Sequence, residues 1–151
     1  MIIKDESQLR VKCLDASAEE ARDIILKLEN ELNISAARGR PGIGLAAIQI
    51  GIPKKVAIIR ITGTNGKQYS INLVNARISQ GFDKTIFRKE GCLSFPGKFV
   101  KTKRYKEIVV VDNVVEPHSF IATGLLSVCI QHELDHLDGI LLSDLDEAAK
   151  L

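Results

Sequence analysis

Two histidines four residues apart, near the end of the chain, constrain its fold most strongly. His132 and His136 are separated by one helical turn, and Glu133 directly follows the first of them. On an α-helix, residues four apart lie on the same face, so both imidazoles can reach one metal ion. The glutamate then stands beside the ion, where it can act as general base for a metal-bound water. The alternative is a helix whose histidines only cap or pack, but this HExxH pattern seldom arises by chance.

The composition is that of an ordinary globular chain, which we expect to fold as one domain over residues 1–151. Hydrophobic residues make up 45% and charged residues 26% of the sequence. The net charge of +2 is too balanced to indicate a nucleic-acid partner. A basic cluster within a strand-like segment comprises Lys98, Lys101, Lys103, Arg104 and Lys106. We interpret this cluster as a solvated face or as protection of an edge strand.

Neither a signal peptide nor a membrane span is expected. Ile2 and Ile3 are followed at once by charged residues, and no apolar run approaches the length of a span. The three cysteines, Cys13, Cys92 and Cys129, are odd in number and widely spaced. This spacing argues against a disulfide framework and for a reducing compartment, so we predict a cytoplasmic protein.

Hydrophobic periodicity predicts an α+β fold with a helix, several short strands and a second helix. Residues 1–16 are expected to be extended, with a turn at 5–8. Ser17 and Glu20 form a capping box at the start of a helix over 17–37. The predicted strands are 55–61, 68–74, 98–105, 106–112 and 114–122. Residues 76–88 are expected to form either two short strands or one strand and a bend around 81–83. Thr123 is expected to cap the last helix, over 124–137, and Gly139 to end it.

A catalytic metal site needs a third protein ligand and one open position. No histidine follows His136, so the ligand is sought upstream. Cys92 is the best candidate, because neighbouring glycines can present its thiolate to an ion. Cys129 lies one turn before His132 and could also approach the ion, although its neighbours indicate the lining of a pocket. Such a site suits Fe(II), Co, Ni and Zn.

Two further features point to a carbonyl substrate. An oxyanion formed during hydrolysis needs hydrogen-bond donors, which the Gln49 side chain and the Leu93 backbone N–H could supply. The predicted last helix also has one face shared by apolar and metal-binding residues, namely Leu125, Val128, Cys129, His132 and His136. This face fits either a core helix or a substrate pocket beside the metal.

Three motifs in order resemble those of the peptide deformylases: Gly42-Ile-Gly-Leu-Ala-Ala-Ile-Gln49, Glu90-Gly-Cys-Leu-Ser94 and Gln131-His-Glu-Leu-Asp-His136. The resemblance implies removal of the formyl group from the formyl-methionine of new polypeptides, with release of formate. It also implies short antiparallel sheets around a central HExxH helix. Because the chain stops soon after that helix, it resembles the compact members that lack a long C-terminal helix, as some phage-encoded members do.

The resemblance also implies roles for individual residues. The metal ligands would be Cys92, His132 and His136, with Glu133 as the general acid/base. Gln49 and the Leu93 N–H would hold the formyl oxygen, and Gly44 would approach the substrate backbone. The wall of the methionine pocket would comprise Ile43, Leu125, Val128, Cys129 and His132. Fe(II) would be the native ion, with Zn, Ni or Co as substitutes.

The resemblance further implies a monomer that acts on formyl-methionyl nascent peptides, at the ribosome or free of it, without nucleic acid or membrane as partner. The run Lys98-Phe99-Val100-Lys101 departs from the family pattern, so preference beyond the methionine is left open. One alternative is a metallopeptidase that cleaves internal peptide bonds, but it would need a third ligand after His136. A second is a non-catalytic protein that binds nascent chains, which would be expected to have lost Glu133 or a ligand.

Overall fold

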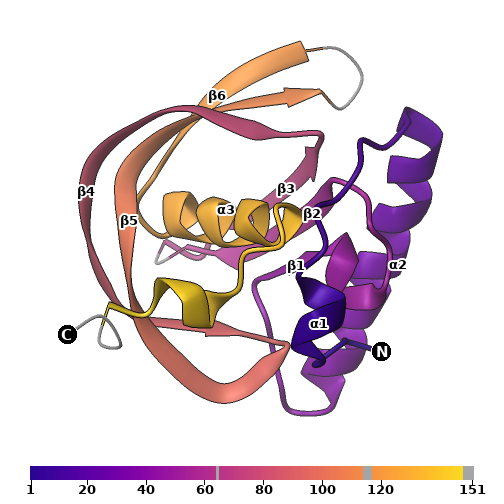
Figure 1. Ribbon diagram of the computed structural model, residues 1–151. Helices are drawn as coiled ribbons and strands as arrows, with labels where there is room; N and C mark the ends of the chain where they lie inside the picture. The colour runs from indigo at the N-terminus through magenta and orange to yellow at the C-terminus, as the bar shows by residue number, and fades with distance from the viewer. Residues whose placement is uncertain (64, 114–116, 148–151) are drawn as a thin grey trace.

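The computed structural model describes residues 1–63, 65–113 and 117–147, and it is an α+β fold (Figure 1). The helices are α1 (Glu6–Leu9), α2 (Ala18–Ala37) and α3 (Gly124–Leu137), with 3-10 helices η1 (Ala47–Ile50) and η2 (Leu142–Leu145). The strands are β1 (Gly44–Ala46), β2 (Val56–Thr62), β3 (Gln68–Val74), β4 (Arg77–Cys92), β5 (Phe95–Asn113) and β6 (Pro117–Thr123). Among the described residues, no helix combines the length and the hydrophobicity needed to cross a membrane.

Two antiparallel sheets hold α3 between them. One has the strand order β1-β2-β3 and the other β4-β5-β6. In Figure 1 the long β4–β5 ribbon curves around one side of α3, while β1–β3 and α2 lie on the other side. Buried residues from α3, such as Ile130 and Leu137, share one core cluster with Ile59 of β2 and Ile108 of β5. The helix that carries His132 and His136 is therefore fixed from both sides.

The capping box at the start of α2 is confirmed. The Ser17 hydroxyl accepts a hydrogen bond from the Glu20 backbone N–H at 3.1 Å, and the Glu20 carboxylate accepts one from Ser17 N at 3.0 Å. An apolar stripe on α2 buries Ala21, Ile24, Leu28 and Leu32, and these residues pack against β1 and β2. This second cluster fixes β1 and η1, which carry the glycine-rich motif.

The prediction of several short strands between residues 76 and 112 was wrong. Two long strands form instead. Gly81 and Asp83, which favour turns, lie within β4, and the positive φ of Asp83 does not end the strand. The register shifts between Ile78 and Gln80, and the ring of Tyr105 fills the space beside Gly81. A two-residue turn joins β4 to β5, since Cys92 pairs directly with Phe95.

Three smaller expectations are also corrected, and a fourth lies partly outside the described residues. The turn expected at 5–8 is the helical turn α1, which Asp5 caps through the Ser7 N–H. Thr123 occupies the N-cap position of α3 but makes no capping hydrogen bond with its side chain. Arg104, expected on a solvated face, is buried, whereas the four lysines of that cluster are exposed. Of the strand expected over 114–122, residues 114–116 lie outside the described residues, and β6 begins at Pro117.

Candidate metal centre and substrate cavity

Helix α3 places the two histidines and the glutamate of the HExxH pattern at the centre of the molecule. The ring centroids of His132 and His136 are 4.9 Å apart, with the rings inclined at 73°. Glu133 and His136 are buried, and His132 is nearly so. The one-turn spacing predicted from the sequence therefore brings both imidazoles to one place.

Cys92 reaches this place from the last residue of β4. Its Sγ lies 3.4 Å from His136 Nε2. One donor atom from each of Cys92, His132 and His136 lies within 4.8 Å of the others, which is the spacing of a metal-binding group. Within the described residues, this group includes no residue downstream of His136. A strand end, rather than a loop, presents the thiol.

Gln49 approaches the thiol from η1 and is almost fully buried. Its Oε1 accepts a hydrogen bond from the Ala46 N–H at 2.9 Å, which fixes the orientation of the amide. Its Nε2 donates to Ser94 Oγ at 3.0 Å and lies 3.5 Å from Cys92 Sγ. The donor end of the amide thus faces the group of metal-binding atoms.

A buried carboxylate that the sequence reading did not assign supports this arrangement. Glu90 Oε2 lies 2.7 Å from His132 Nδ1, and Oε1 accepts from Thr102 Oγ1 and Arg104 Nε, each at 2.8 Å. Arg104 Nη1 also donates to Asp135 at 2.7 Å. Glu90 stands two residues before Cys92 in the motif, which is a local signal for a shared strand face. Its pairing with Arg104 is non-local and has no such signal.

The buried charges adjust the pKa values of these groups. Burial would raise the pKa of Glu90, but hydrogen bonds from His132 and Arg104 outweigh it and lower the pKa to about 2. The ionised Glu90 therefore accepts the proton on His132 Nδ1, which leaves Nε2 to face the site. Burial opposes a charge on His132, but its hydrogen bonds to Cys92 and Glu90 hold its pKa well above the usual value.

His136 and Glu133 show the opposite response to burial. Burial, together with the charge of His132, lowers the pKa of His136 to about 3, so this ring is neutral and keeps a lone pair. Burial raises the pKa of Glu133 to about 7, and the carboxylates of Glu90 and Asp135 add to this effect. A carboxyl group with a pKa near neutrality can both accept and donate a proton at physiological pH.

The same residues line a cavity of about 400 Å³. Ten of the eleven residues singled out from the sequence line it: Ile43, Gly44, Gln49, Cys92, Leu93, Leu125, Val128, Cys129, His132 and Glu133. The eleventh, His136, is buried and is not among the lining residues. A Cβ at Gly44 would collide with the Glu133 carboxylate, so only glycine leaves room for that side chain. Cys13 is buried in the core and lies outside this group.

Known proteins are similar to this chain in sequence and in fold. The polypeptide deformylase family model matches residues 2–150. A peptide deformylase of Rhizobium meliloti is 38% identical over 106 residues, which cover 69% of this chain and 61% of the relative. This chain thus spans about three-fifths of the length of the first curated relatives that it matches.

Solved structures agree over almost the whole chain. A peptide deformylase from Synechococcus elongatus in complex with actinonin has a TM-score of 0.82 at 31% identity, covering 97% of this chain and 78% of that one. A class I type b peptide deformylase from Acinetobacter baumannii, bound to Met-Ala-Ser, has a TM-score of 0.79 at 25% identity and covers 96% of both chains. With a family model that covers nearly every residue and matching folds, this chain belongs to the polypeptide deformylase family.

Proposed function

We propose that this protein is a metal-dependent hydrolase that removes the formyl group from the N-terminal formyl-methionine of new polypeptides and releases formate. One observation carries the proposal: donor atoms of Cys92, His132 and His136 converge within 4.8 Å at the inner end of a cavity that Glu133 and Gln49 also line. The relative bound to Met-Ala-Ser supports the choice of substrate, because that peptide is a deformylated product.

The donor set fits a divalent metal ion. A thiolate and two imidazoles form a three-ligand site with one position open. The negative charge of Glu90 stabilises a positive charge on the His132 ring, and a cation bound at Nε2 in place of a proton would be stabilised in the same way. Glu133 Oε1 is buried without a hydrogen-bond partner among the described residues, which also suits a cation close by. A divalent ion held there would supply Lewis-acid activation of water and of the formyl carbonyl.

The protein's own groups would perform the remaining steps. The apolar wall, which includes Leu125, Val128 and Cys129, would hold the methionine side chain. Gln49 Nε2 and the Leu93 N–H would donate hydrogen bonds to the formyl oxygen as negative charge develops on it. Glu133 would accept a proton from the attacking water and return it to the amine nitrogen as the carbon–nitrogen bond breaks. Formate and a free methionyl N-terminus are the products.

The finer assignments follow from this chemistry. Fe(II) is the proposed native ion, with Zn, Ni or Co as substitutes, because a thiolate accepts each of these ions. The partner is the formylated nascent chain, met in the cytoplasm where such chains are made, and the enzyme acts as a monomer. The core cluster shared by α3 and both sheets supports a single catalytic domain.

The test is formate release from a formyl-Met-Ala-Ser peptide. Protein prepared without oxygen is loaded in parallel with Fe(II), Ni(II), Co(II) or Zn(II), and turnover is expected with at least one ion. Glu133→Ala should retain the metal and lose about 10²- to 10⁴-fold in kcat, the usual contribution of general acid–base catalysis. Cys92→Ala should lose the metal, whereas Glu19→Ala on the exposed face of α2 should change neither. Metal-loaded protein that releases no formate with any ion would refute the proposal.

A further inference from the structure

The outer part of the cavity carries positive charge only. Three exposed cationic residues line it: Arg40 after α2, Lys89 near the end of β4, and Lys98 near the start of β5. The acidic residues that line the same cavity are Glu90 and Glu133, and both are buried toward the metal-binding group. A ligand that extends out of the cavity therefore meets three cations and no exposed carboxylate from the lining.

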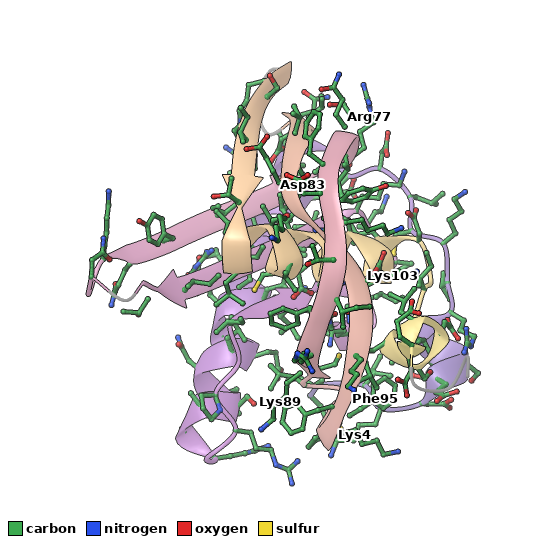
Figure 2. The ribbon with its side chains drawn as sticks, turned by 90° about the vertical axis from the view of Figure 1, so that its left-hand side faces the viewer. Lys4, Arg77, Asp83, Lys89, Phe95 and Lys103 are labelled. Carbon is green, nitrogen blue, oxygen red and sulfur yellow. The ribbon has the colours of Figure 1, made fainter. Side chains whose placement is uncertain are left out.

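These three cations are available for a ligand. None of them forms a salt bridge with another described residue. The Lys89 ammonium lies 4.7 Å from the centroid of the exposed Phe99 ring, which also lines the cavity. In Figure 2, Lys89 and Phe95 lie near one end of the β4–β5 ribbon, whereas Arg77 lies at the other. Arg40, Lys89 and Lys98 thus form a positive rim, and two of these three cations lie at the end of the ribbon that carries Cys92.

The charge of the whole ribbon reinforces that of the rim. The ribbon, residues 77–113, holds nine of the 21 Lys and Arg residues and four of the 19 Asp and Glu residues. It therefore carries a charge of +5 and the rest of the chain −3, although the net charge is only +2. A field of this kind, concentrated beside a cleft, raises the local concentration of ligands of the opposite charge.

We infer that the enzyme prefers formylated peptides with acidic side chains at the second and third residues. This inference rests on the proposed function, because the methionine in the inner pocket sets the direction in which the chain leaves the cavity. Asp or Glu side chains at these positions would pair with Lys89, Lys98 and Arg40, and lysine there would be repelled. The apolar Phe99 ring beside Lys89 would contact the carbon atoms that join the acidic group of the substrate to its backbone.

The expected preference is about tenfold in kcat/KM at low salt. Each solvent-exposed ion pair contributes about 1.4- to 5-fold in affinity. Replacing attraction by repulsion at two or three cations brings the contrast between Asp and Lys to about a factor of ten. Since these contacts lie away from the reacting carbonyl, they stabilise the ground state and the transition state equally. The preference should therefore appear in KM, leave kcat unchanged and weaken as salt is added.

The experiment compares formyl-Met-Ala-Asp-amide, formyl-Met-Ala-Asn-amide and formyl-Met-Ala-Lys-amide, with a second set carrying the charge at the second residue. The amide cap removes the terminal carboxylate, so only the side chain differs. The affinities of the unformylated Met-Ala-Asp-amide and Met-Ala-Lys-amide are measured in parallel by calorimetry, a readout that needs no turnover. The Asp peptides are expected to be best in both measurements.

Charge reversal assigns the effect to the rim. Lys98→Glu should reduce the Asp-over-Lys preference at least threefold, and adding Lys89→Glu should invert it. Lys106→Glu is the matched control, because it makes the same charge change on the same exposed strand, eight residues and roughly 26 Å away. Equal use of Asp and Lys peptides by the unaltered enzyme would overturn the inference, as would an equal effect of the control. Absence of formate from every peptide would refute the proposed function instead, while the two affinities would still decide the inference.

Discussion

The buried Glu90 carboxylate is expected to be the most sensitive position outside the metal-binding group. Glu90→Gln keeps the shape of the side chain but removes its charge. The new amide can still accept from Thr102 and from Arg104 Nε through one oxygen. Its NH₂ group, however, would face Arg104 Nη2 and His132 Nδ1, which both donate hydrogen bonds to Glu90 in the native protein. The substitution therefore places hydrogen-bond donors opposite one another in the protein interior, without an acceptor between them.

The loss of stability in Glu90→Gln depends on which partners the Arg104 guanidinium retains. Breaking a buried ion pair by removing one partner usually costs about 3–5 kcal/mol. Asp135 still accepts from Nη1 at 2.7 Å, so the cation retains one counter-charge, and the lower end of that range applies. We expect the free energy of unfolding to fall by about 3 kcal/mol. With a typical urea m-value of about 2 kcal/mol per molar, the midpoint should move by about 1.5 M.

The assay is urea unfolding of metal-free protein at neutral pH, followed by circular dichroism. Asp135→Asn is the matched control, since it is also isosteric and contacts the same guanidinium. Its carboxylate makes a single hydrogen bond to Arg104 and is a quarter exposed, so its loss should cost only about 1 kcal/mol. If Glu90→Gln unfolds at the same urea concentration as the unaltered protein, or at a higher one than Asp135→Asn, the carboxylate does not hold the ribbon to α3.

Metal affinity gives a second, independent readout of Glu90. The carboxylate orients the His132 ring through Nδ1 without lying in the metal-binding group itself. Loss of such an outer partner typically lowers metal affinity by about 10- to 100-fold. Competition with a chromophoric chelator for Co(II) should detect this change in Glu90→Gln. Unchanged affinity would mean that packing alone orients His132.

Two further predictions concern groups away from the metal-binding atoms. Burial raises the pKa of Asp112, although hydrogen bonds from the backbone N–H groups of Val74 and Asn113 oppose it. The folded state therefore binds the proton more tightly than the unfolded state, and this contribution to stability is lost as the pH rises from about 4 through the raised pKa. Asp112→Asn should gain in stability relative to the unaltered protein between pH 3 and pH 7, as measured by urea unfolding; parallel pH profiles would contradict this. Burial also raises the pKa of Cys13 to about 11 and that of Cys129 to about 12, so both should resist iodoacetamide at pH 8 in the folded protein. Mass spectrometry should find alkylation at Cys92 alone, and bound metal should suppress it; labelling of Cys129 at the same rate would refute the burial argument.

Local sequence signals predicted the elements that depend on local geometry. The capping box of α2 and the extent of α3 follow from hydrogen bonds and spacings within a few residues. The short strands were wrongly predicted for the opposite reason. Gly81 and Asp83 carry the composition of a turn, but cross-strand pairing with β5 outweighs their local preference. Tertiary contacts of this kind cannot be predicted from any short window of the sequence.

The site residues show the same difference between local and non-local signals. Spacing on one helix was enough to bring His132 and His136 together, because four residues make one turn whatever surrounds the helix. Glu90, Thr102 and Arg104 meet only through the register between β4 and β5, which no local pattern specifies. The sequence therefore indicated directly that the two histidines lie together, whereas the position of the Glu90 carboxylate beside one of them needed the structure.

The register of the ribbon thus links the stability of the fold to the chemistry of the site. Thr102 and Arg104 are buried on one face of β5, whereas Lys101 and Lys103, which alternate with them along the strand, are exposed. A slip of one residue would exchange these faces, because side chains alternate along a strand. It would bury lysines against Glu90 and turn the guanidinium toward solvent. The Glu90–Arg104 pair therefore favours a single register between β4 and β5. In that register Cys92, at the end of β4, meets the two histidines of α3.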